Sequence, residues 1–255
     1  MIKFFRKIRQ KMLTENKFNK YFLYAIGEIV LVVIGILIAL SINTSNENNK
    51  SKREASFQLS KLKDNLNSDK TQLIAEISSD SLFINNLNFC VKVLSDEIDA
   101  PLEEFLDNFY YLSEVVDFNP TRGAFDGLIS SGKIELINNH NLLDTLFSYY
   151  NTNESKGWDS ALEDYSRNVI IPYLLGFDHI SNGSLDEGID YIQFDISKFN
   201  IPSKSLEDYK NDLFLLNGLR FKIQMFEGQK AAYTELVIVV DSLINSIDIE
   251  LMKSK

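Results

Sequence analysis

The sequence predicts a mainly α protein: one N-terminal transmembrane helix, then an extracytoplasmic helical-bundle domain whose long first and last helices pair antiparallel. Three observations predict this fold class. An apolar run spans residues 21–42, and apolar residues recur at alternating spacings of three and four in residues 59–98 and in residues 219–251. We therefore expect three parts: a basic amphipathic cytoplasmic segment (residues 1–20), a transmembrane helix (21–43) and an extracytoplasmic α-helical domain (44–255).

The apolar run YFLYAIGEIVLVVIGILIALSI has the length of one membrane crossing. Its 22 residues would make about 33 Å of helix, enough for a hydrocarbon core of about 30 Å. A cleaved signal peptide is the alternative. The long apolar core, the extended basic region before it and the lack of a small-x-small cleavage site favour an uncleaved signal anchor.

Positive charge is concentrated before the apolar run. Residues 1–20 contain seven Lys and Arg residues and one Glu, a net charge of +6, and the positive-inside rule places them in the cytoplasm. The large C-terminal part then lies outside the cytoplasm. Lys50, Lys52 and Arg53 weaken this asymmetry without reversing it.

The basic segment has a helical pattern of its own, because Ile2, Phe5, Ile8 and Met12 are spaced by three and four. As a helix it would lie on the inner leaflet of the lipid bilayer, with its cations near anionic headgroups. The alternative is a topology signal alone, and the sequence leaves both open. The cations of this segment that we assign to the membrane surface are Lys3, Arg6, Lys7, Arg9 and Lys11.

The rest of the chain is acidic. The whole chain has a formal charge of −10 and its first 20 residues carry +6, so the remainder carries −16. This charge argues against nucleic acid as a partner, because nucleic-acid binding depends on cations that neutralise phosphates. Cys90 is the only cysteine, which excludes a disulfide within the chain.

Two helical seams are predicted beyond the membrane helix, since sustained spacings of three and four are typical of long packed helices. The first seam contains Leu59, Leu62, Leu66, Leu73, Ile77, Ile84, Leu87, Val91, Leu94 and Ile98. Asp69 and Asp80 occupy its two positions where an apolar residue is missing. The second seam contains Leu219, Ile223, Phe226, Tyr233, Val237, Val240, Ile244, Ile247 and Leu251.

Two polar stretches interrupt the first seam, NSDK at residues 67–70 and SSDS at residues 78–81. Both are read as bends, with a hairpin turn at SSDS as the alternative.

The region between the seams is predicted to form shorter helices. Expected boundaries are a start at Pro101, a cap at Thr121 with an end near Gly132, a start at Asn139 or Asn141, an end or kink at Pro172, and a cap at Ser205. Residues 191–196, YIQFDI, are read as a short strand.

The opening MIKFFRKIRQKMLTENKFNKYFLYAIGEIVLVVIGILIALSIN and the later segment SSGKIELINNHNLLDTLFSYY resemble a family of uncharacterised single-pass membrane proteins of Bacteroidetes, known only as a domain of unknown function. The resemblance is specific over residues 1–43 and looser over the rest of the chain. Relatives usually end the membrane helix with INxWNE, whereas this chain has INTSNE and lacks that tryptophan. The resemblance implies an inner-membrane location with a periplasmic helical domain, and it implies no activity.

The sequence contains no recognisable motif for catalysis, a metal or a cofactor. His140 and His179 have no partner at ligand spacing, and Cys90 lies beside the first seam as a packed thiol. The acidic loop around Asp186 lacks the spacing of an EF-hand and is read as solvated. We therefore predict that the protein is not an enzyme and that it uses no cofactor.

Aromatic residues gather in the middle of the chain, where they could line a ligand pocket. Core packing is the preferred interpretation. These residues are Phe105, Phe109, Tyr110, Tyr111, Phe125, Phe147, Tyr149 and Tyr150.

Two functional hypotheses remain. In the first, the protein is an interaction or scaffold module. Gly27, Gly35 and Ala39 are spaced by multiples of four, so one helix face would allow close approach of a second copy or of another membrane protein. Glu28 would add a polar contact to this face, or be a tolerated interfacial acid. In the second, the protein is a periplasmic sensor that signals through a partner protein, since about 20 cytoplasmic residues are too few for an output domain.

Overall fold

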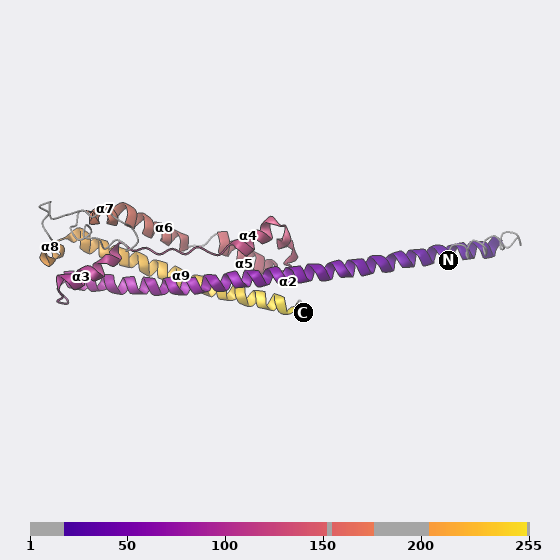
Figure 1. The fold of residues 1–255 in the computed structure, drawn as a ribbon, viewed down its shortest axis with the longest axis horizontal. Helices are drawn as coiled ribbons and strands as arrows, with labels where there is room; N and C mark the ends of the chain where they lie inside the picture. The colour runs from indigo at the N-terminus through magenta and orange to yellow at the C-terminus, as the bar shows by residue number, and fades with distance from the viewer. Residues whose placement is uncertain (1–17, 152–154, 176–203, 254–255) are drawn as a thin grey trace, which may run out of the picture. The chain divides into compact units, whose positions relative to one another are not determined.

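The computed structural model describes residues 18–151, 155–175 and 204–253. These residues are mainly helical, as predicted, and contain no strand (Figure 1). The α-helices are α2 (Phe18–Leu94), α3 (Leu102–Phe109), α4 (Gly123–Ser130), α5 (His140–Asn151), α6 (Ser155–Tyr165), α7 (Ile171–Leu174), α8 (Leu206–Lys210) and α9 (Leu213–Lys253). Short 3₁₀ turns occupy Tyr110–Leu112 and Lys133–Leu136, and a π-helical turn occupies Ser166–Ile170. The strand expected at residues 191–196 lies outside the described residues.

The described chain divides into two compact units, residues 18–57 and Gln58–Lys253, and α2 contributes to both. In the first unit, every residue from 29 to 50 is exposed. The part of α2 that begins at Ala25 contains a window long and apolar enough to cross a membrane, and none of that window is buried. By length and composition, this helix can be the predicted transmembrane segment.

In the second unit, α2 continues through both polar interruptions of the first seam without a turn. Ser78 and Ser81 donate their hydroxyls to the carbonyl oxygens four residues earlier, at 3.0 and 2.7 Å. These polar side chains are thereby satisfied within the helix. The hairpin turn considered for SSDS is therefore wrong.

Two hydrophobic clusters bury the predicted seams. One joins the C-terminal part of α2 to α3, α6, α8 and the first half of α9, and the other joins Leu59–Leu73 of α2 to α4, α5 and the second half of α9. Figure 1 shows α5 and α6 lying along α9. The seam residues that are fully buried are Leu62, Leu66, Leu73, Leu87, Leu219, Phe226, Tyr233, Val240 and Ile247. The seam predictions are thus confirmed at the positions that carry the core.

Two ion pairs join α2 to α9 beside the second cluster. Lys63 Nζ lies 2.6 Å from Asp248, and Lys70 Nζ lies 2.6 Å from Asp241. Each pair joins a lysine of α2 to an aspartate of α9. Because all four side chains are about a third or more exposed, each pair contributes only about 0.2–1 kcal/mol, and its main effect is on register.

Most predicted helix boundaries are confirmed. Pro101 precedes α3, and Asn139 Oδ1 accepts a hydrogen bond from Leu142 N at 3.1 Å at the start of α5. Ser205 forms a reciprocal capping box with Asp208 at the start of α8. After α4, Gly132 has φ 69°, the left-handed conformation that glycine adopts without strain.

Two boundary predictions differ from the structure. Thr121 does not cap α4, because the helix begins at Gly123 and its N-cap position is Arg122, with no side-chain cap. The backbone N–H of Thr121 donates to Asp69. Pro172, where a kink stays a prediction, does not end the helical segment, which continues to Leu174. It lies in the first turn of α7, where a missing N–H is tolerated, directly after the π-helical turn.

Gly228 allows α6 to pack closely on α9. A Cβ at this position would lie 2.5 Å from the Cη2 atom of Trp158, far inside van der Waals contact. The indole of Trp158 therefore rests on the glycine surface of α9, with 38% of the residue still exposed.

We predict that Gly228→Ala lowers the free energy of unfolding by about 1–2 kcal/mol, because the new methyl group displaces the indole from α9. The measurement is chemical denaturation of the full-length protein. Gly157→Ala on α6 is the matched control, since a Cβ there meets nothing within 4 Å, and it should leave stability unchanged or raised. Equal effects of the two variants would contradict the packing argument.

Candidate functional site

The residues predicted to contact another membrane helix lie on an open face of α2. Gly27, Gly35 and Ala39 are exposed, and Glu28 is half-buried. Among the described residues, nothing lies within 4 Å of a Cβ built on Gly27 or Gly35. These positions are therefore accessible, while the predicted membrane-surface cations of residues 1–20 lie outside the described part of the chain.

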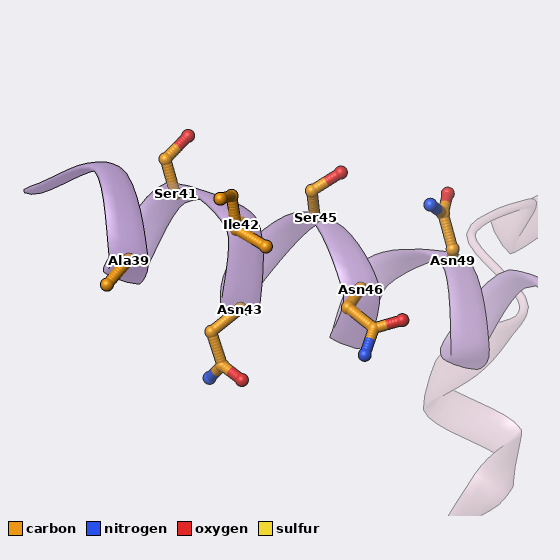
Figure 2. A pocket seen from close by; sticks show the side chains of 7 residues that line it. All are labelled: Ala39, Ser41, Ile42, Asn43, Ser45, Asn46 and Asn49. Carbon is orange, nitrogen blue, oxygen red and sulfur yellow. The ribbon is translucent and has the colours of Figure 1, made fainter.

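The surface of α2 changes from apolar to polar near Ser41. Figure 2 shows Ser41, Ser45 and Asn49 on one side of the helix, and Asn43 and Asn46 on the opposite side. All of these side chains come from one helix, so they form an open surface without converging on a ligand. The change coincides with the predicted end of the membrane segment at residue 43.

The candidate ligand and metal residues are not brought together. His140 is the exposed first residue of α5, whereas His179 and the acidic loop around Asp186 lie outside the described residues. Cys90 is fully buried, and burial raises the pKa of its thiol to about 12, as expected for a packed cysteine. In the described ranges, no group of three His, Cys, Asp or Glu side chains could hold a metal ion.

The aromatic residues do not form one pocket. Phe105 and Phe109 belong to the first hydrophobic cluster, with Tyr111 at its edge, and Phe125, Tyr149 and Tyr150 belong to the second. Tyr110 and Phe147 are exposed. Core packing, the preferred interpretation, therefore accounts for most of them.

Asp69 is a buried acceptor at the centre of the second cluster. Its carboxylate accepts hydrogen bonds from the backbone N–H of Thr121 at 2.8 Å and from the hydroxyl of Tyr149 at 2.7 Å. The residue is fully buried. It therefore ties α5 and the segment before α4 to α2, and its role is structural.

A polar groove of about 580 Å³ lies beside α6, with Asp117, Asn119, Asp159 and Ser166 among its lining residues. Its volume falls within the range of small-molecule sites. Two of its lining residues, the half-buried Asp159 and the buried Ser166, are hydrogen-bonded to buried residues of α9, so we treat it as the candidate functional site.

Asp159 connects this groove to the interior. Its Oδ1 accepts hydrogen bonds from Gln229 Nε2 at 2.6 Å and from the Tyr233 hydroxyl at 2.7 Å. Burial raises the pKa of Asp159, and these two hydrogen bonds oppose that shift. The carbonyl of Val116, also in the groove wall, accepts from Gln229 at 3.0 Å.

Ser166 connects the other end of the groove to a buried lysine. Lys222 of α9 is fully buried, and its ammonium donates to the Ser166 hydroxyl and lies 5.0 Å from the ring centre of Phe226. Burial lowers the pKa of Lys222 to about 7, because the interior disfavours the charged form. An amine that titrates near neutral pH is typical of functional sites, although core polar pairs show the same shift.

The sequence alone does not single out Asp159, Lys222 and Gln229 as candidate site residues. Gln229 had a detectable signal, since it fills the gap between Phe226 and Tyr233 in the second seam, as Asp69 and Asp80 fill gaps in the first. Lys222 and Asp159 had none, because their partners come from other helices.

Comparison with known proteins identifies the family. Residues 28–157 match a family of unknown function, DUF6090, and this stretch is half of the chain. The chain belongs to the DUF6090 family. No curated protein and no solved structure matches it.

The DUF6090 match begins in α2 and ends in α6, so it includes Asp69 and Asp80 but neither Lys222 nor Gln229. Residues 1–27, where the resemblance seen in the sequence is most specific, lie outside the matched stretch. Because the function of the family is unknown, membership assigns no role to the groove.

We predict that Lys222→Met raises the free energy of unfolding at pH 7 by about 2 kcal/mol, since it removes a buried charge while keeping the volume. The folded pKa of Lys222 is depressed, so the wild type should gain stability as pH rises from about 7 towards 10. The variant should lack this gain, and the difference between the two should shrink with rising pH in thermal denaturation. A lower stability of Lys222→Met at every pH would contradict the prediction and would show that the bond to Ser166 outweighs the cost of burial.

Proposed function

We propose that this DUF6090 protein is a membrane-anchored interaction or scaffold module. In this proposal residues 1–20 are cytoplasmic, residues 21–43 cross the inner membrane once, and residues 44–255 form a periplasmic helical domain. The observation that carries the proposal is the exposed apolar surface of α2. Large apolar side chains from Phe22 to Ile42 are between 44% and 76% exposed.

Such an apolar surface must be covered by lipid or by another protein. Burying apolar area is worth about 25 cal/mol per Å², and soluble proteins rarely expose a contiguous patch of more than a few hundred Å². The apolar side chains surround the helix between residues 29 and 40 instead of forming one stripe. Apolar residues on all sides of a helix favour a lipid bilayer over a protein groove, which would cover one side.

The orientation rests on charge. The net charge of +6 in residues 1–20 favours retention of this end in the cytoplasm, and the polar surface from Ser41 to Asn49 follows on the other side. The acidic remainder supports a partner other than nucleic acid.

The interaction role rests on two features. The Lys63–Asp248 and Lys70–Asp241 pairs support an antiparallel arrangement of α2 and α9, which would form the stalk of the periplasmic domain. The small residues Gly27, Gly35 and Ala39 would let a second membrane helix approach closely, giving a homodimer or a complex with another membrane protein.

A periplasmic sensor is the second candidate. The groove beside α6 supports it, because Asp159 and Ser166 link that groove to buried groups of α9. A small molecule that raises the melting temperature of the protein would favour this role, whereas recovery of a specific partner from detergent-solubilised membranes would favour the scaffold.

The topology predicts that alkaline phosphatase fused to the C-terminus is active in cells, because the enzyme requires the oxidising periplasm. Green fluorescent protein fused at the same position should not fluoresce after export through the general secretory route. The control is the same pair of fusions to a variant with residues 1–43 deleted, which should reverse both readouts. An expressed but inactive phosphatase fusion would contradict the orientation.

Association through the small-residue face predicts that Gly35→Leu weakens self-association about tenfold, because the larger side chain separates the two helices. Chemical cross-linking of the full-length protein in detergent measures the dimer fraction. Val33→Leu is the control, since residue 33 lies on the opposite side of α2, and it should have no effect.

Glu28→Gln in the same assay separates the two interpretations of this acid. A reduced dimer fraction supports a polar contact, and no change supports a tolerated interfacial acid. A dimer fraction that is equal in Gly35→Leu, Val33→Leu and the wild type would contradict the association face.

A further inference from the structure

A polar interval separates the two hydrophobic clusters along both long helices. The buried members of the clusters leave residues 74–82 between them on α2, where Ile77 packs partly against the second cluster, and residues 227–232 on α9. Each interval contains one fully buried residue, Asp80 on α2 and Gln229 on α9. Neither residue belongs to the apolar core, yet neither reaches solvent.

The register of the two helices places these residues near one another. The ion pairs set Lys63 opposite Asp248 and Lys70 opposite Asp241, and the same register carried ten residues further along α2 brings Asp80 between Gln229 and Tyr233. Electrostatic coupling of Asp80 to Lys230 and Tyr233 supports this placement. Gln229 and Tyr233 themselves are joined by a hydrogen bond of 3.0 Å.

If Asp80 is ionised, this interval has more buried hydrogen-bond acceptors than donors. Within the described residues, both carboxyl oxygens of Asp80 and the amide oxygen of Gln229 are buried acceptors without a donor. The amide nitrogen of Gln229 has two hydrogens and three acceptors within reach, Val116 O, Asp159 Oδ1 and the Tyr233 hydroxyl, so it has none to spare for Asp80. An unpaired buried carboxylate is one of the costliest arrangements in a protein interior.

A single proton on Asp80 would remove the buried charge and supply the missing donor to Gln229 Oε1. We propose that Asp80 is a proton-binding site that, when occupied, donates a hydrogen bond to Oε1 of Gln229 and holds α2 against α9 in the interval between the two clusters. Loss of the proton leaves a carboxylate near an amide oxygen, so the contact between α2 and α9 in this interval weakens. The chain then carries a pH-sensitive contact at the middle of its longest helix pair.

The electrostatic surroundings support proton uptake. Burial, together with nearby carboxylates and against the opposing effect of one lysine, raises the pKa of Asp80 to about 7. The groups facing Asp80 are Glu76 on α2, Lys230 and Tyr233 on α9, and Asp159 on α6. The pKa values of Glu76 and Asp159 are themselves raised, in part by Asp117 before α4.

The sign of the effect follows from the folded pKa being higher than the usual value of 3.8. The stabilisation from Asp80 is fully present below the pKa of the unfolded chain and is lost as pH rises through about 7. The helix pair should therefore be tightest in mildly acidic medium and should weaken across neutral pH.

Asp80→Asn tests the proposal, because an amide supplies a permanent donor to Gln229 Oε1. Melting temperatures of the full-length protein in detergent would be measured from pH 5 to pH 8. The wild type should lose about 5 °C more than Asp80→Asn between pH 5 and pH 7. Equal pH dependence of the two proteins would overturn the proposal.

Asp69→Asn is the matched control. Asp69 lies on the same helix and is as deeply buried, but it accepts from Thr121 N and the Tyr149 hydroxyl. Its amide variant keeps an acceptor for Thr121 N and can donate to the Tyr149 hydroxyl, so it should change the melting temperature by a similar amount at every pH from 5 to 8. A change in Asp80→Asn that is likewise independent of pH would overturn the proposal.

Infrared difference spectroscopy of the wild type keeps the proposal testable even if Asp80→Asn does not fold. A protonated-carboxyl band should disappear with a midpoint near pH 7. Its isotope shift on labelling of aspartate would assign it to an Asp side chain. Absence of any carboxyl titration between pH 5 and pH 8 would overturn the proposal.

Discussion

The packing of α2 against α9 is the interaction on which the rest of the second unit depends. Both hydrophobic clusters are built on these two helices, and every shorter described α-helix adds buried residues to a cluster. A buried helix pair of this length excludes water from its contact. Every side chain between the two helices must therefore be apolar or find its hydrogen-bond partner inside the protein.

The two seam acids of α2 meet this constraint in different ways. Asp69 accepts hydrogen bonds from α5 and from the segment before α4, so it attaches distant parts of the chain to α2. Asp80 has no donor among the described residues. The same residue type, at the same depth and on the same helix face, is thereby suited to fixed attachment in one place and to proton binding in the other.

Lys222 is a buried basic residue that also finds its hydrogen-bond partner inside the protein. Its aliphatic stem and ammonium lie within the first cluster against Phe226, with the Ser166 hydroxyl as acceptor. Ser166 begins the π-helical turn and lines the groove, and Asp159 lies in the preceding helix, α6. The groove is thus a surface at which groups bonded to the interior meet solvent. The residues predicted to contact another membrane helix, Gly27, Gly35 and Ala39, form a separate candidate surface in the first unit.

The sequence alone determined the helical class, the apolar segment and most of both seams, because periodicity of three and four follows directly from the helix repeat. It also determined the caps at Asn139 and Ser205, whose bonds reach only three residues along the chain. The assignment of Asp69 and Asp80 to the seam was correct, since burial of a helix face includes every residue on it. Tertiary structure decided what these acids contact and that Thr121 serves Asp69 instead of capping α4. It also decided that Lys222 is buried against Ser166, because those partners lie 52 to 80 residues apart in the chain and local sequence carries no record of such pairings.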